Sequence, residues 1–177
     1  LLMVALTSLF GTSTMTLFPV FAKDVPHGDA RLFGYLAGAA GVGSLTAALY
    51  LASLTTVVGL GPKIAWSAAG MGASSIAFAA SRSAPLSLVI LVAFGFSLML
   101  LLAGCNTLLQ TVVEDDKRGR VMSLYTTAFM GTVPLGSLMA GTMASYLGAP
   151  RAVSLGGLAC IAGASVFAWR LPRLRSQ

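Results

Sequence analysis

Long charge-free stretches alternate with short charged ones along the whole chain. Each of six such stretches reaches, or nearly reaches, the roughly 20 residues that a helix needs to cross about 30 Å of hydrocarbon. They lack the strict apolar and polar alternation of a membrane barrel strand, and lipid then leaves only helices as spanning elements. The charge-free stretches are 1–22, 32–62, 64–81, 83–113, 121–150 and 152–169.

This pattern predicts an all-α, polytopic membrane protein in which the whole chain forms a single bundle of six transmembrane helices. Because the loops between them are short, sequence neighbours are expected to be antiparallel neighbours. The predicted helices cover about 2–21, 34–57, 63–81, 86–108, 122–146 and 152–170. The predicted loops lie near 22–32, 58–62, 82–85, 109–121 and 147–151.

Composition excludes most other classes of protein. Residues of the set AVILMFWYC make up 56% of the chain and charged residues 9%. A soluble domain of this length would carry about 44 charged residues, whereas this chain has 11 basic and 5 acidic ones. The net charge of +6 does not indicate nucleic-acid binding, because the basic residues are scattered between apolar stretches. Cys105 and Cys160 lie within such stretches, which favours buried thiols over a disulfide.

The basic residues are divided unequally between the two sets of loops, which predicts the orientation. One set holds Lys63, Lys117, Arg118, Arg120, Arg170, Arg173 and Arg175, and the other holds Lys23, Arg31, Arg82 and Arg151. The richer side is expected to be cytoplasmic, with both chain ends inside, in a bacterial inner membrane. The chain begins at Leu1 within an apolar stretch and without a basic segment. We therefore expect a fragment that lacks its N-terminal half, rather than a signal peptide.

The predicted spans carry little of the chemistry that enzymes need. No charged residue lies clearly within them, so they offer no carboxylate for a proton relay. The sole histidine, His27, falls in a predicted loop, and an intramembrane serine protease needs a histidine within a span. Clusters of metal-ligating residues and nucleotide-binding fingerprints are also missing from the sequence. We therefore expect no enzyme, no metal and no cofactor.

Neutral polar residues recur at helical spacing within the first predicted span and at the end of the fourth. Ser8, Thr12 and Thr16 form a stripe at i, i+4 and i+8, and Asn106 and Gln110 are four residues apart. They would either line a solute cavity or form helix–helix hydrogen bonds worth about 0.6 kcal/mol each. The cavity interpretation is stronger for the two amides, because an amide left unpaired beside lipid is costly.

Glycine is dense in the second and fifth predicted helices, where small residues let helix backbones approach closely. Proline within a helix removes a backbone hydrogen bond and permits a bend. The residues predicted to pack or bend helices are Gly34, Gly38, Gly41, Gly131, Pro134, Gly136 and Gly141.

One segment, before the fifth predicted helix, concentrates charge. Arg120 stands at the expected start of that helix, where the helix dipole disfavours a cation, so an acidic group should compensate it. A solvated loop and a specific gating contact both remain open for this segment. The gating interpretation involves Asp115, Asp116, Arg118, Gly119 and Arg120.

At this segment the sequence resembles the second half of major facilitator superfamily transporters, most closely the branch of the enterobactin exporter and the macrolide-efflux proteins. The resemblance covers nearly the whole chain. The residues that carry it are Asn106–Gln110, Arg118–Tyr125, Gly131–Gly136, Ala140–Gly141, Phe33–Leu36 and Gly41–Gly43.

The resemblance implies that the six helices correspond to helices seven to twelve of a twelve-helix protein. In that family the first, second, fourth and fifth helices of each half face the cavity, and the third and sixth are peripheral. The sequence departs from the family in the loop at Gly59–Lys63, which lacks the family's acid and arginines.

We therefore predict transport of small molecules by alternating access, in the form of secondary active efflux of amphipathic compounds such as drugs or siderophores. The partners would be the lipid bilayer, the missing N-terminal half and a solute. Proton coupling would need a carboxylate that these spans do not supply. Two alternatives stay open, a complete six-helix protein that homodimerises as a pore or transporter, and a non-transporting membrane scaffold.

Overall fold

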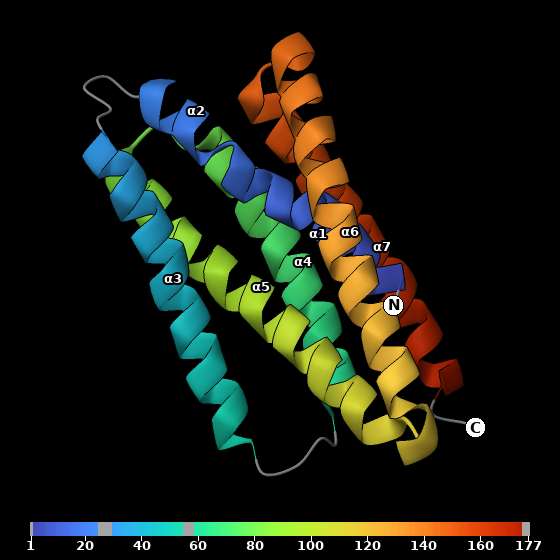
Figure 1. Ribbon diagram of the computed structural model, residues 1–177. Coiled ribbons are helices and arrows are strands. Elements are labelled where there is room, and N and C mark those ends of the chain that lie inside the picture. The colour runs from blue at the N-terminus through green and yellow to red at the C-terminus, as the bar shows by residue number, and fades with distance from the viewer. Residues whose placement is uncertain (1, 25–29, 55–58, 175–177) are drawn as a thin grey trace.

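The computed structural model describes residues 2–24, 30–54 and 59–174, without the side chains of residues 2–4, 6, 12, 13, 22–24, 30 and 170–174. Every regular element in these ranges is an α-helix (Figure 1). The helices are α1 (Leu2–Thr16), α2 (Phe18–Asp24), α3 (Ala30–Ser53), α4 (Leu60–Ala80), α5 (Ala84–Val112), α6 (Asp115–Leu147) and α7 (Ala149–Leu174).

The first predicted helix is divided at Leu17 into α1 and α2. Pro19 has no N–H to donate to the carbonyl one turn earlier, so the α-helical ladder is interrupted there. The Leu17 N–H instead donates to the Thr14 carbonyl at 3.2 Å, which tightens the last turn of α1. A helical pattern resumes when Phe21 N–H donates to Leu17 O at 3.2 Å.

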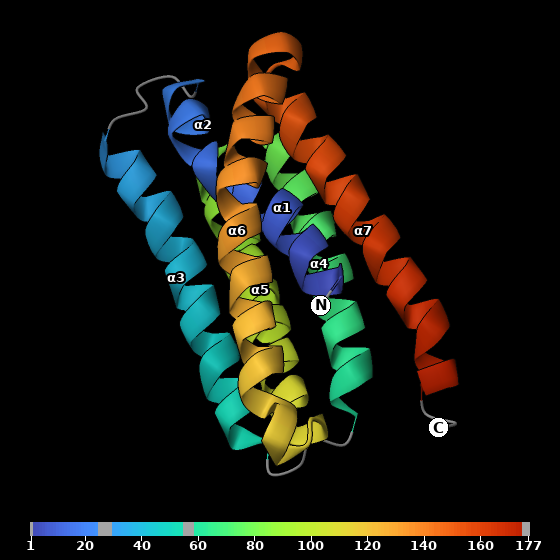
Figure 2. The ribbon, with the colours of Figure 1, turned by 45° about the vertical axis from the view of Figure 1, so that its right-hand side comes forward.

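The helices form one bundle with two sides. On one side α3 and α6 stand in front, with α1 and α5 between and behind them (Figures 1 and 2). α4 and α7 pack along each other on the opposite side. α3 packs on α5, α5 on α4, and α1 on both α6 and α7, so the bundle is continuous from α3 round to α6.

Glycines bring the backbones of two helix pairs into direct contact. A Cβ atom added to Gly43 of α3 would overlap the Val92 carbonyl of α5, and one added to Gly95 would overlap the Ala40 carbonyl. Ser44 Oγ spans the same crossing, since it lies 3.0 Å from Ala40 O and 3.2 Å from Gly95 O. Gly72 of α4 and Gly157 of α7 face each other in the same way. Small residues are therefore what permits these close crossings.

Two clusters of buried side chains fill the interior. At the end where α2 lies, the Phe18 ring packs edge-on against Phe78 and Phe94, with centroids 5.5 and 6.5 Å apart. Towards the other end, Ile64, Leu101 and other apolar side chains from α4 to α7 form the second cluster. Cys105 and Cys160 are buried and unpaired.

The structure corrects several predicted boundaries. The predicted loop at 109–121 is helical except for Val113 and Glu114, and the predicted loop at 147–151 reduces to Gly148. Gly148 has a φ of 87°, which lets the chain reverse there without the strain that a side chain would cause. His27 lies outside the described residues.

The count of six spans is not confirmed. Within the described residues, three helices are long and apolar enough to cross a membrane, at Arg31–Ser53, Ala84–Val112 and Ala149–Trp169. α1 is only 15 residues long because of the interruption at Leu17. α4 is rich in glycine, alanine and serine, and α6 begins with five charged residues in its first six.

Candidate functional site

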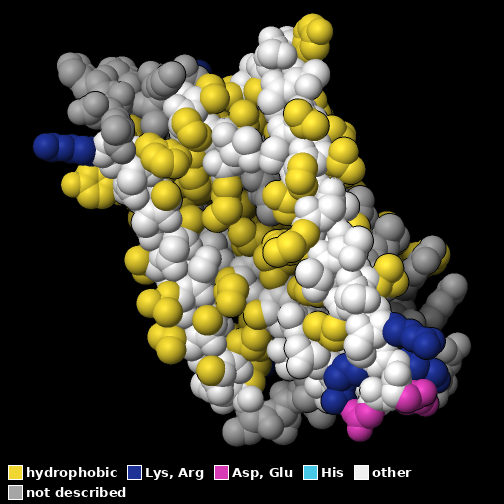
Figure 3. Space-filling model, viewed as in Figure 1, with side chains coloured by type: hydrophobic (Ala, Val, Ile, Leu, Met, Phe, Trp, Pro, Cys, Tyr) yellow, Lys and Arg dark blue, Asp and Glu magenta, His cyan; other side chains and the backbone are white. Residues whose placement is uncertain are grey.

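The side of the bundle between α3 and α6 is open and apolar. α3 and α6 do not pack on each other within the described part of the chain. Figure 3 shows this side hollowed between the two helices, with hydrophobic side chains along both. Leu45 of α3 is 62% exposed and Leu138 of α6 is 69% exposed, although both lie mid-helix. Each helix buries only the opposite face, against α5 or α1.

The serine and threonine stripe of α1 is divided between the interior and this open side. Ser8 is fully buried, whereas Thr16 is exposed and its hydroxyl lies 3.3 Å from that of Ser137 on α6. The side chain of Thr12 lies outside what the structure describes. Two residues before Thr16, and so on a different face of α1, the hydroxyl of Thr14 lies 3.3 Å from that of Ser75 on α4. α1 therefore makes polar contacts to helices on both sides of the bundle.

The two amides lie near the end of α5 and pair with each other. Gln110 Nε2 donates to Asn106 Oδ1, and Gln110 is exposed while Asn106 is partly buried. The sequence did not single out Tyr125, whose hydroxyl donates to the Leu102 carbonyl at 3.0 Å. Tyr125 is the largest buried side chain of α6 and ties that helix to α5 close to the amides. Its neighbours in sequence, Leu124 and Thr126, give no signal that would have distinguished it.

Most of the glycines predicted to pack helices have no neighbour. Gly136 is the exception, because a Cβ there would overlap the Leu9 carbonyl of α1. A Cβ at any of the other five would meet nothing within 4 Å, and all five are exposed: Gly34, Gly38, Gly41, Gly131 and Gly141. Pro134 is also exposed, and α6 continues through it as one helix. A packing role for these residues would therefore need a partner on the open side.

The charged segment is the first turns of α6 rather than a loop. Glu114 precedes the helix and Asp115 lies in its first turn, where a negative charge is favourable for the dipole. Lys117 pairs with Glu114 at 2.5 Å and Arg118 with Asp115 at 2.6 Å. Arg120 is exposed and forms no ion pair with any described residue, although Asp116 is exposed nearby in sequence.

The grooves between the helices are shallow, and the described residues form no cluster of side chains that could bind a metal ion. Among the described residues no three His, Cys, Asp or Glu side chains gather closely enough to bind a metal ion. In Figure 3 the acidic side chains and most of the basic ones gather at the lower end of α6, and one basic side chain projects at the end where α3 begins. The open side can therefore make mainly apolar contacts, with hydroxyl and amide groups at a few places.

A protein-family model described as transmembrane secretion effector, within the major facilitator superfamily, matches residues 1–177. The chain belongs to this family. It is thus an integral membrane protein of a transporter family, with the lipid bilayer as its surroundings and a solute as its cargo. No match is found among curated proteins.

Helices α4 and α7 pack along each other, away from the open side between α3 and α6. The resemblance implied that the third and sixth helices of a half are peripheral, and the assignment of α4 and α7 to these two positions stays a prediction.

Proposed function

We propose that the chain exports amphipathic small molecules by alternating access, as one six-helix unit that works against a second one. The single observation that carries this proposal is the open, apolar side between α3 and α6. If these two faces contacted only water or lipid, alanine would be favoured over glycine at the five exposed positions. Glycine destabilises a helix interior by about 0.5–1 kcal/mol relative to alanine. A second helical unit that approaches closely would require small residues there.

The polar residues facing this side would contact the solute. Thr16 and Ser137 offer hydroxyls beside exposed apolar side chains of α6, and Asn106 and Gln110 offer amides near the charged end. Such a mixture of apolar area and a few polar groups suits an amphipathic solute. Ser8 and Thr12 are assigned to the same lining on the sequence pattern.

The start of α6 would act as a gate. Asp115 and Arg118 are paired within the helix, and the exposed Arg120 is available to an acidic group of the second unit in one of the two transport states. Gly119 has open space around it, so a second backbone can approach there. If transport is coupled to protons, the carboxylate comes from that second unit, since the described part of α3 and α5 has no acidic residue.

The charged end is assigned to the cytoplasm of a bacterial inner membrane. Lys63, Lys117, Arg118 and Arg120 are at this end, against Arg31, Arg82 and Arg151 at the other. The excess agrees with the positive-inside rule. On this assignment the C-terminal end of α7 lies inside, whereas α1 begins partway along the bundle (Figure 1).

Cross-linking from the open side tests the proposal. A Gly38→Cys variant in native membranes should cross-link to a second helical unit, because the buried Cys105 and Cys160 give little background. The matched control is Ala162→Cys on α7, exposed on another helix, which should give no such product. Mass spectrometry identifies what is captured.

A transport assay then distinguishes a transporting unit from a non-transporting scaffold. Proteoliposomes with the cross-linked partner present should export a fluorescent amphipathic dye, and Gln110→Leu should change the range of dyes exported. A product that contains two copies of this chain would favour the homodimeric alternative. Capture of a second unit with no transport of any dye would favour the scaffold and contradict the proposal.

A further inference from the structure

A second groove lies on the outer surface of the bundle, away from the open side. It has a volume of about 290 Å³ and its floor is α5, on which α3 and α4 both pack. It lies near the end where α4 begins. The residues that matter in it are Tyr50, Lys63, Trp66, Ser67, Phe96 and Ser97.

Lys63 places a positive charge in this groove with no anionic partner. Its Nζ lies 5.4 Å from the centroid of the Tyr50 ring, a cation–π contact. Both ion pairs among the described side chains are in the segment from Glu114 to Arg118. Lys63 is also the fourth residue of α4, where the helix dipole disfavours a cation. An anion bound here would offset both the charge and the dipole.

Ser97 supplies a hydrogen-bond donor that the bundle does not use. It is only 9% exposed, it lines the groove, and it makes no hydrogen bond to any described residue. Most helical serines here donate to a carbonyl of the preceding turn, as Ser67 does to Lys63 O at 2.8 Å. The Ser97 hydroxyl is thus available to a ligand in the groove.

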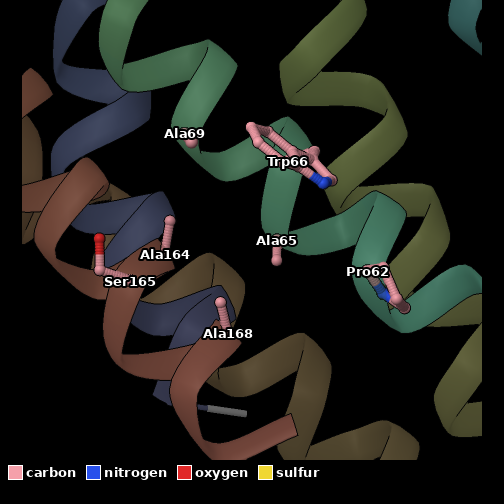
Figure 4. A pocket seen from close by; sticks show the side chains of 7 residues that line it. All are labelled: Pro62, Ala65, Trp66, Ala69, Ala164, Ser165 and Ala168. Carbon is pink, nitrogen blue, oxygen red and sulfur yellow. The ribbon is translucent and has the colours of Figure 1, made fainter.

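Two apolar grooves adjoin the Lys63 groove on either side. Trp66 is shared with a groove of about 380 Å³ between α4 and α7, where Ala65 and Ala69 face Ala164 and Ala168 (Figure 4). Phe96 and Ser97 are shared with a groove of about 570 Å³ between α3 and α5. The groove between α3 and α5 continues along α5 towards Val89, away from Lys63.

We propose that these three grooves bind one anionic phospholipid of the leaflet at the charged end. Its phosphate contacts the Lys63 ammonium and the Ser97 hydroxyl, and its two acyl chains occupy the flanking apolar grooves. Basic pockets between membrane helices suit such headgroups, and Trp66 and Tyr50 are side chains that favour the bilayer interface. A membrane lipid is favoured over a soluble anion because both flanking grooves are apolar. This assignment does not depend on the transport proposal.

Quenching of Trp66 by brominated lipid tests the site. The chain has two tryptophans, so Trp169→Phe leaves Trp66 as the only one. In nanodiscs of phosphatidylcholine, brominated phosphatidylglycerol should quench Trp66 at a lower mole fraction than brominated phosphatidylcholine does. Lys63→Gln should raise that mole fraction about fivefold, the factor expected for one basic residue at an anionic headgroup. Lys63→Arg should retain the preference, and Ser97→Ala should weaken it.

Lys117→Gln is the matched control, because it removes a charge at the same end from a side chain already paired with Glu114. It should leave the preference unchanged. Equal quenching by the two lipids in the Trp169→Phe protein would overturn the proposal, as would an equal shift in Lys63→Gln and Lys117→Gln. Loss of the preference in an excess of inorganic phosphate would assign the groove to a soluble anion instead. Far-UV circular dichroism of each variant checks the helical fold.

Discussion

The contact between α4 and α7 predicts opposite effects for two neighbouring glycines. A Cβ at Gly157 would lie 2.7 Å from the Gly72 carbonyl oxygen and 2.8 Å from Ile76 Cγ1. A Cβ at Gly156 would lie 3.4 Å from its nearest neighbour, the Phe10 carbonyl oxygen. Gly157→Ala therefore needs the two backbones to separate by about 0.7 Å to restore ordinary contact, whereas Gly156→Ala needs almost no movement.

The magnitude follows from two opposing terms. Overpacking a close contact costs about 1–3 kcal/mol, and alanine in place of glycine in a helix contributes about 0.5–1 kcal/mol of stability. Since both variants share the second term, their difference isolates the first. Gly157→Ala should be less stable than Gly156→Ala by about 1–3 kcal/mol.

The assay is reversible unfolding in mixed micelles, with rising dodecyl sulfate in a non-ionic detergent, followed by far-UV circular dichroism. The free energy of unfolding is compared among the parent and the two variants under one lipid and detergent composition. If Gly157→Ala is as stable as Gly156→Ala, the backbones of α4 and α7 do not approach as the structure has them.

Three further outcomes are expected from the same unfolding measurement. Tyr125→Phe removes the hydrogen bond to Leu102 O and should cost about 0.6 kcal/mol and no more than about 1.7; a neutral result would mean that this hydrogen bond does not help to hold α6 on α5. Phe78→Ala should cost about 3–5 kcal/mol because the ring is 1% exposed, while Leu158→Ala, 55% exposed, should cost far less; equal losses would contradict the placement of the core. Asp115→Asn removes a charge that favours the helix dipole and also the ion pair with Arg118, so it should cost about 0.3–1 kcal/mol at low salt and almost nothing in 1 M salt; a loss unaffected by salt would argue against both electrostatic contributions.

The helical state of the apolar stretches was predictable from the sequence. Long charge-free stretches indicate membrane spans, and lipid leaves few alternatives to a helix for a span. The helical state of the charged segment was not predictable, since a run of charged residues is equally typical of a loop. Asp115 in the first helical turn and Arg118 three residues later both stabilise a helix. Outside the hydrocarbon the same residues can be helical and solvated at once, so α5 and α6 extend beyond their apolar cores.

The faces of the glycine-rich helices could not be assigned from spacing. Gly41 and Gly43 are two residues apart, yet one is open and the other contacts α5. Small residues suit any close contact, so the pattern cannot distinguish a contact within the bundle from one with a partner. Similarly, the stripe from Ser8 to Thr16 predicts a common face but not which neighbour meets each hydroxyl.

The central claim is that a second helical unit covers the open side between α3 and α6. The accessibility of spin labels to oxygen tests this claim most directly. Labels are placed at Leu45, Leu138 and, as the control, Leu158, in the protein as it occurs in its native membrane, transferred to nanodiscs. All three positions are exposed in this chain. Oxygen partitions into lipid, so the account predicts low oxygen collision rates at 45 and 138 and a high rate at 158. Equally high rates at all three positions would show that the open side faces lipid and would contradict the account.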